Sequence, residues 1–222
     1  MSYPYPQPSA TLPAYPFQDR LLPLVLNTWV TPTPVPTPTS HPMTLPQTVF
    51  VKSSSVWRPE YSSYTRVAGE VMNNIDKTAW PVNVSVTFCS SAGQVAGSGS
   101  SYGYGDSAPP GWRVPFKLLL ETAEDWTSYR FGLTYGLYDT SPVAGCTEKR
   151  NYRGYWSGSR CHVVGEILNI CDRGLTSLEV VATFYDSAGR VINADSAYAN
   201  PSSVPVGGTA SFDVSPSDGS RI

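Results

Sequence analysis

The sequence has little charge and no long apolar run. Asp, Glu, Lys and Arg make up 14% of its 222 residues, against about 25% in an ordinary soluble domain. The formal net charge is -2, and no cluster of Lys and Arg is present that could neutralise a run of phosphates, so we expect no nucleic acid partner. No stretch approaches the roughly 20 apolar residues that cross a bilayer, so we expect no membrane span.

Histidine is equally scarce, and its scarcity argues against an enzyme. The chain has only His41 and His162, whereas a serine or cysteine nucleophile needs a base within hydrogen-bond reach. The carboxylates, Glu70 and Glu166 among them, stand in no acid/base motif for glycoside hydrolysis. No Asp-rich calcium loop is present. We therefore expect no catalytic residue, cofactor or metal, and place Glu70 and Glu166 on the solvent side of a strand.

Proline, tyrosine and glycine are plentiful, with 21, 14 and 18 residues respectively. Together with abundant Ser and Thr, this composition is typical of extracellular all-β proteins. The first residues lack the basic start and apolar region of a signal peptide, so the expected location, extracellular or at the cell surface, is inferred from composition alone.

Residues 1–45 form a segment of their own. Residues 1–20 are rich in Pro, Tyr and Ser, residues 21–30 are apolar, and residues 31–39 alternate Thr and Val with Pro. Alternating prolines fix φ and remove backbone donors, which predicts an extended spacer. The spacer is either a bare linker or a carrier of O-linked glycan.

Beyond residue 45 the sequence repeats itself. Residues 67–116 and 163–212 share 18 identities in 50 positions at a constant offset of 96 residues, without a gap. Such self-similarity indicates a duplicated domain. In each copy apolar residues alternate with polar ones, as in Val82, Val84, Val86 and Phe88, and turns carrying glycine separate these stretches, so each copy is predicted to consist of strands.

The predicted fold is all-β. We expect two tandem immunoglobulin-like or fibronectin III-like β-sandwiches over residues 46–142 and 143–222, preceded by the extended Pro/Thr-rich segment. The constant offset would put the counterpart of the closing strand near Tyr129–Gly136 beyond Ile222. If Ile222 is the genuine end, the second sandwich is expected to lack its last strand; the alternatives are a sequence trimmed at its C-terminus, or an N-terminal tail that packs back on its own first sandwich.

The repeats carry the pattern Gly-Glu-[Val/Ile]-x-Asn-x-x-Asp, followed in the second copy by Thr183-Phe184-Tyr185-Asp186-Ser187-Ala188-Gly189. This pattern resembles the FxLYD domain family of bacterial surface proteins. The first copy departs from it, with Cys89 and Ser90 in place of Tyr and Asp. The resemblance implies an immunoglobulin-like sandwich at the bacterial cell surface, in a family without established catalytic residues.

Cysteines and aromatic residues are the remaining candidates. None of the four cysteines has the CxxC spacing of zinc or redox sites. Three lie between residues 146 and 171, and the predicted disulfide is Cys146–Cys161; the alternative is unpaired, buried thiols.

Exposed aromatic rings could stack on sugars or anchor a protein interface. The candidates are Tyr102, Tyr104, Tyr152, Tyr155 and Trp156. Alternatively, the tyrosines are ordinary strand residues and Trp112 and Trp126 cap the first sandwich.

Two functions remain open. In the first, the protein is a non-catalytic structural subunit of a filament or surface layer. The apolar segment of one copy would complete the second sandwich of the next as a donated strand, and so build a homopolymer. The candidate donor residues are Leu21, Leu22, Leu24, Val25, Leu26, Trp29 and Val30. The alternative is a monomeric surface module that binds carbohydrate or protein.

Overall fold

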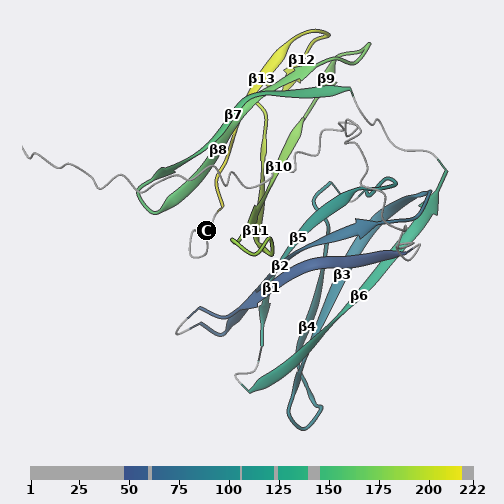
Figure 1. The fold of residues 1–222 in the computed structure, drawn as a ribbon, viewed down its shortest axis with the longest axis vertical. Helices are drawn as coiled ribbons and strands as arrows, with labels where there is room; N and C mark the ends of the chain where they lie inside the picture. Colours follow the sequence, from purple (N-terminus) through teal and green to yellow (C-terminus); the bar gives the residue numbers. More distant parts are fainter. Residues whose placement is uncertain (1–47, 60–61, 106, 123–124, 140–145, 217–222) are drawn as a thin grey trace, which may run out of the picture.

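The computed structural model describes residues 48–59, 62–105, 107–122, 125–139 and 146–216, which form thirteen β-strands and, within these ranges, no helix (Figure 1). Every strand pair is antiparallel. The expected all-β class is therefore confirmed. We call residues 48–139 the first repeat and residues 146–216 the second repeat. The predicted N-terminal segment lies outside the described residues.

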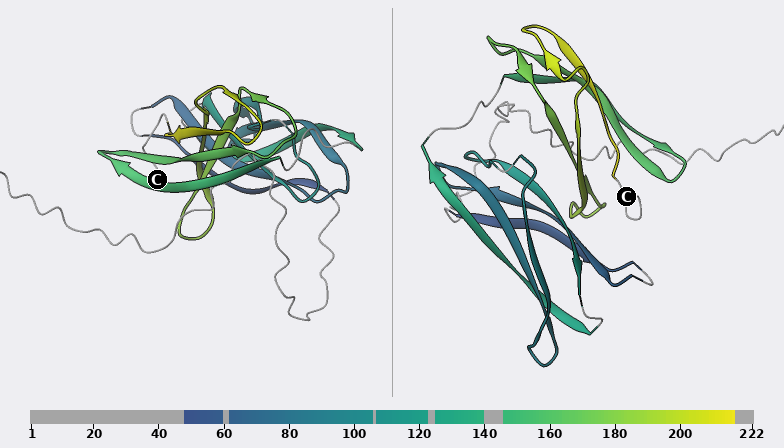
Figure 2. Two further views of the ribbon diagram at one scale, coloured as in Figure 1. Left: turned by 90° about the horizontal axis from the view of Figure 1, so that it is seen from above. Right: turned by 180° about the vertical axis from the view of Figure 1, so that it is seen from behind.

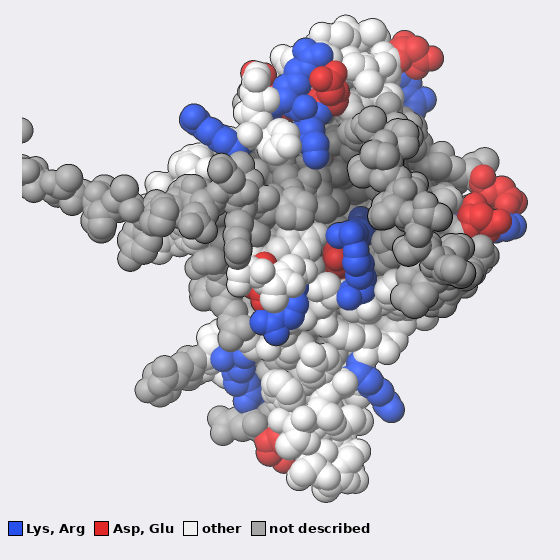
Figure 3. Space-filling model, viewed as in Figure 1, with Lys and Arg blue, Asp and Glu red and all other residues white. Residues whose placement is uncertain are grey.

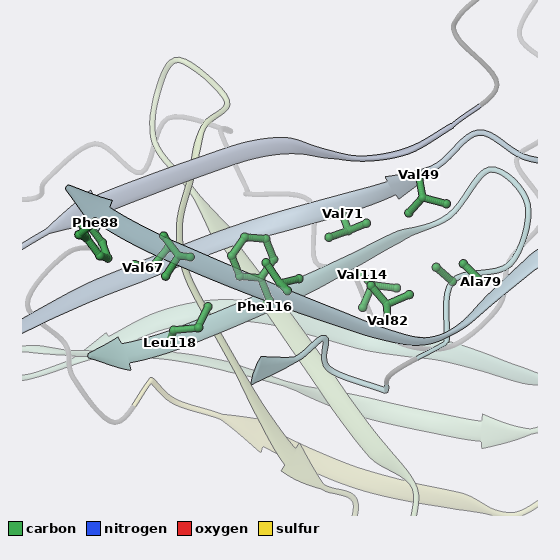
Figure 4. Packing of buried hydrophobic residues seen from close by; sticks show 12 residues of the cluster. Val49, Val67, Val71, Ala79, Val82, Phe88, Val114, Phe116 and Leu118 are labelled. Atoms are coloured by element: carbon green, nitrogen blue, oxygen red, sulfur yellow. The ribbon is translucent and has the colours of Figure 1, made fainter. Parts of the chain in front are cut away.

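The first repeat contains two three-stranded sheets, in the orders β1-β2-β5 and β4-β3-β6. Their strands are β1 (Val49–Trp57), β2 (Tyr64–Asn73), β3 (Thr78–Ser90), β4 (Val95–Tyr102), β5 (Arg113–Glu121) and β6 (Trp126–Tyr138). Successive side chains of a strand point to opposite faces, so the alternating valines of β3 share one face. Figure 4 shows the resulting core, where Phe88, Phe116 and Val67 lie between the strands.

The second repeat contains a three-stranded sheet in the order β13-β8-β7 and two pairs, β10-β11 and β12-β9. Its strands are β7 (Thr147–Ser157), β8 (Arg160–Asn169), β9 (Leu175–Thr176), β10 (Glu179–Tyr185), β11 (Val191–Tyr198), β12 (Ser203–Val204) and β13 (Thr209–Val214). Val180, Ala182, Phe184, Ile167 and Phe212 belong to its core. Both repeats thus have the packed sheets of a sandwich-like fold.

The offset of 96 residues holds in the structure. Gly69 pairs with Phe116 across β2 and β5, and Gly165 pairs with Phe212 across β8 and β13. A Cβ added at Gly165 would lie 2.7 Å from the ring of Phe212, so glycine is required there to let the aromatic ring lie over the backbone. The ring of Phe116 lies over Gly69 in the same way.

A buried asparagine fixes the end of the same strand in each repeat. Asn73 donates through Nδ2 to the carbonyls of Lys77 and Ala108, at 2.8 and 2.6 Å, and its Oδ1 accepts from the amide of Ile75. Asn169 repeats this arrangement with the carbonyls of Arg173, Val204 and Pro205 and the amide of Cys171. Each side chain thus connects backbone groups of two loops through buried hydrogen bonds.

The two repeats differ in the strands that pair with β3 and with its counterpart β10. β3 pairs with β4 on one side and β6 on the other, whereas β10, its counterpart, pairs with β11 alone among the strands that the structure describes. The core-facing side of β7 is open at Tyr152 and Trp156, which are 45% and 42% exposed.

Candidate functional site: the interface between the repeats

The two repeats meet where the β10-β11 hairpin lies on the outer face of the β1-β2-β5 sheet (Figures 1 and 2). In β2, Val67 and Val71 face the core of the first repeat. Strand alternation therefore turns Ala68 and Glu70 toward the second repeat. Both are buried although they lie on the outside of their own sandwich.

Glu70 is the centre of this interface. Its Oε2 accepts a hydrogen bond of 2.8 Å from the hydroxyl of Tyr185, and its Oε1 lies 3.6 Å from Nη1 of Arg113. The side chain is only 2% exposed. The prediction that Glu70 lies on the solvent side of a strand is wrong, because the hairpin of the second repeat covers that side. A buried carboxylate is tolerated here because it has both a hydrogen-bond donor and a positive charge nearby.

Burial and the nearby charge of Glu70 both raise the pKa of the Tyr185 phenol above its ordinary value. The phenol therefore keeps its proton and remains a donor to the carboxylate. A second charged pair crosses the interface beside Glu70. Lys117 Nζ lies 3.5 Å from Asp195 Oδ2 across the interface, and burial lowers its pKa.

An apolar cluster lies beside the charged groups. Trp57, Ala68, Tyr185 and Val191 pack together and are all at least 94% buried. The backbone amide of Val191 also donates to Oγ of Ser53 at 2.9 Å. The interface thus combines a small dry cluster with a few partnered polar groups, as in the core of a protein–protein interface.

The turn that carries Tyr185 is shaped by Asp186. Its Oδ1 accepts from the amides of Ala188 and Arg190, both at 2.9 Å, and its Oδ2 accepts from Arg190 Nε at 2.8 Å. These hydrogen bonds lower the pKa of the Asp186 carboxyl. Gly189 has a φ of 76°, which only glycine adopts without strain. The Tyr-Asp-Ser-Ala-Gly stretch therefore presents the tyrosine next to a turn that is held by three hydrogen bonds to Asp186.

Glu166, the counterpart of Glu70, lies in a different environment. It is half-buried and accepts 2.8 Å from Nδ2 of Asn151, a residue of the neighbouring strand β7. Nearby, Nδ1 of His162 lies 2.9 Å from Oδ1 of Asp213, and the ring of Tyr155 stacks on His162 with centroids 5.0 Å apart. Among the described residues no serine or cysteine hydrogen-bonds this histidine.

The predicted disulfide is wrong in its pairing. Cys146 is bonded to Cys171, while Cys161 is free and buried. Cys161 lies in β8 with its side chain in the core of the second repeat, so it cannot reach the loop that holds Cys146. Cys171 follows Asn169, whose side chain holds its amide, and Ile170 N donates to the carbonyl of Cys146, which brings the two cysteines together.

The candidate aromatic residues do not gather on one face. Tyr102 is 59% exposed on β4, whereas Tyr104 is largely buried at the interface, with its hydroxyl 3.5 Å from the carbonyl of Ala194. Tyr152, Tyr155 and Trp156 all lie on β7. Tyr155 shares the outer face with His162, while Trp156 pairs with Cys161 and points to the other face. Trp126 packs on Phe88 in the first core.

The candidate donor residues of the predicted strand donation lie outside the described residues. They are Leu21, Leu22, Leu24, Val25, Leu26, Trp29 and Val30.

The face of the molecule in Figure 3 shows no large region of one charge among the described residues. Lys, Arg, Asp and Glu side chains are interspersed over this face. No group of three His, Cys, Asp or Glu with the geometry of a metal site occurs in the described part of the chain. The described residues also contain no helix long and apolar enough to span a membrane.

Comparison with known proteins gives no family. No family model matches the chain, and no curated protein sequence matches it.

Proposed function

We propose that the protein is a non-catalytic structural subunit at the cell exterior, which assembles with copies of itself. Its repeats would be immunoglobulin-like sandwiches of the FxLYD kind. The interface between the repeats supports a structural role, because Glu70, Tyr185 and Arg113 connect the repeats through buried polar contacts. Flexible tethering would not require a buried carboxylate at the contact.

The observation that carries the proposal is the difference between β3 and β10. β3 has partners on both sides, while β10 pairs only with β11 among the described strands. An edge with free backbone groups can accept another strand. Tyr152 and Trp156, exposed on the core-facing side of β7, would be covered by a strand at this edge. The proposed occupant is the apolar segment 21–30 of a neighbouring copy.

The test compares the full chain with a variant carrying Leu22→Asp, Leu24→Asp and Leu26→Asp. A matched control places the same charges in the spacer, as Thr33→Asp, Thr37→Asp and Thr39→Asp. Sedimentation velocity over a concentration series, with electron microscopy, should show polymers for the full chain and the control and monomers for the leucine variant. Assembly that survives the leucine substitutions would contradict strand donation. A chain that stays monomeric at high concentration would contradict the structural function as a whole.

The alternative is a monomeric module that binds carbohydrate or protein. Tyr155 and Trp156 support it, as exposed rings on one strand, but they point to opposite faces. A glycan array probed with the chain and with Tyr155→Ala would reveal this activity.

A further inference from the structure

The duplication gives each half of the interface a counterpart elsewhere in the chain. The half supplied by the second repeat is the β10-β11 hairpin, and its counterpart is the β3-β4 hairpin of the first repeat. The half supplied by the first repeat is the outer face of β1-β2-β5, and its counterpart is the outer face of β7-β8-β13. Both counterparts are open: Val95 is 64% exposed and Tyr155 is 37% exposed.

The two hairpins have the same turn. Ser90 N donates to Gln94 O at 2.9 Å, as Asp186 N does to Arg190 O, and Gly93 has a φ of 77°, close to that of Gly189. The β3-β4 turn lies at the end of the first repeat that points away from the second repeat (Figures 1 and 2). A second molecule can therefore approach it.

Each residue of the buried apolar cluster has a counterpart on the β3-β4 hairpin or on the outer face of β7-β8-β13. Trp57 pairs with Arg66 and Tyr155 pairs with His162, so Tyr155 takes the place of Trp57. Val164 takes the place of Ala68, Cys89 that of Tyr185, and Val95 that of Val191. The face has the larger side chain, Val164, where the hairpin has the smaller one, Cys89. In the intramolecular contact the order is reversed, with a small alanine against a tyrosine. The two changes are opposite in sign, but the loss from Tyr185 to Cys89 is larger than the gain from Ala68 to Val164.

The polar groups of the outer face of β7-β8-β13 differ from those of the intramolecular contact. Within the chain, Glu70 needs a hydroxyl from the hairpin, and Lys117 contacts Asp195 of the hairpin. In the second repeat, Glu166 has Asn151 as a partner in its own sheet, and Asp213 has His162. Glu166 and Asp213 therefore depend on no donor from a second copy, while Arg153, which pairs with Val164, is exposed on the same face. The β3-β4 turn, Ser90-Ser91-Ala92-Gly93-Gln94-Val95, has no charged residue.

We propose that the β3-β4 hairpin of one copy docks on the outer face of β7-β8-β13 of a second copy and repeats between molecules the contact that joins the repeats within each. The contact is heterologous, so it builds an open filament unless the rotation between successive copies closes a ring. It rests on the proposed self-association, but it uses surfaces other than the apolar segment 21–30.

A disulfide trap tests this arrangement on the full chain. Tyr185 and Ala68 belong to one cluster within the chain, so Cys89 should lie against Val164 of the neighbouring copy. The variant Val164→Cys, incubated under mild oxidation, should give a ladder of dimers and higher species on a non-reducing gel, linked through Cys89. Adding Cys89→Ser should abolish the ladder, and Val206→Cys, at a residue 58% exposed elsewhere in the second repeat, should give none.

A mixing experiment tests the same contact without a covalent bond. Val95→Glu blocks the hairpin and Val164→Glu blocks the face, so each variant alone should lose at least tenfold in association. Equal amounts of the two should form dimers and nothing longer, because each variant retains one intact half. Val206→Glu is the matched control.

The possible outcomes separate the proposals. Polymers that form without a link through Cys89, and that survive Val95→Glu, would overturn the hairpin contact and leave strand donation standing. Loss of assembly in the leucine variant together with an intact ladder would overturn strand donation alone. A chain that is monomeric in every form would overturn both. Circular dichroism and thermal melting of each variant would show whether its fold is intact.

Discussion

The hydroxyl of Tyr185 donates a 2.8 Å hydrogen bond to Oε2 of Glu70, a residue 115 positions earlier and in the other repeat. The carboxylate is 2% exposed, and Arg113 lies 3.6 Å from its second oxygen. Each partner thus depends on the other: the carboxylate would lose its donor without the tyrosine, and the phenol its acceptor without the glutamate. The orientation of the two repeats is therefore linked to one buried hydrogen bond.

Tyr185→Phe should lower the free energy of unfolding by about 1–3 kcal/mol, because it leaves a buried carboxylate oxygen without its donor. Urea unfolding followed by tryptophan fluorescence measures the change. Tyr198→Phe removes the same hydroxyl at a position 68% exposed and should change stability by less than about 0.5 kcal/mol. Combining Tyr185→Phe with Glu70→Gln should cost less than the sum of the single changes. Equal effects of the two Tyr→Phe changes would show that the contact does not form in solution.

The same pair should give a pH dependence in the alkaline range. Burial and the charge of Glu70 raise the pKa of the Tyr185 phenol, whereas the phenol of an unfolded chain titrates near pH 10. Above about pH 10 the folded state therefore holds a proton that the unfolded state has lost, and stability falls as the pH rises. Below that pH the contribution is fully present. The advantage of the native chain over Tyr185→Phe should be constant from pH 7 to about 9 and shrink above 10. An advantage that grows with pH would contradict the buried phenol.

Much of the fold could be predicted from sequence, but little of the interface could. The strands follow from alternation within each repeat, since Val82, Val84 and Val86 need only a local pattern to specify one face. The burial of Glu70 depends on a hairpin more than a hundred residues away, and local alternation places it toward solvent. One signal was available. The second repeat has Tyr185 where the first has Cys89, a difference that indicates unequal roles for the two hairpins.

The role of Asn73 and Asn169 was also missed, although their identity in both repeats indicates a common requirement. Asn73→Ala should cost about 2–4 kcal/mol, because it removes the side-chain hydrogen bonds to the carbonyls of Lys77 and Ala108 and to the amide of Ile75; the Ala108 carbonyl keeps the amide of Ala79 as a donor. Asn74→Ala is the matched control at the next position, since its Nδ2 has no hydrogen-bond partner among the described residues, and it should cost less than about 1 kcal/mol. Thermal unfolding of the two variants measures both. Similar costs at the two positions would mean that the loops are not held by Asn73.

The disulfide of the structure and the one predicted from the sequence can be distinguished by experiment. The bond between Cys146 and Cys171 closes a loop of 25 residues, and removing such a crosslink from the unfolded state costs about 3 kcal/mol in the chain-entropy model. Cys171→Ser should therefore lower stability by about that amount under oxidising conditions. Cys161→Ser should leave the disulfide intact, so that any loss of stability it causes reflects packing in the core and persists under reducing conditions.

Non-reducing peptide mapping of the native chain should find Cys146 joined to Cys171, with Cys89 and Cys161 as thiols. Because burial raises the pKa of the Cys161 thiol, it should react with an alkylating reagent more slowly than Cys89 at pH 8. A peptide linking Cys146 to Cys161, or equal alkylation rates for the two thiols, would contradict the arrangement of the second repeat described above.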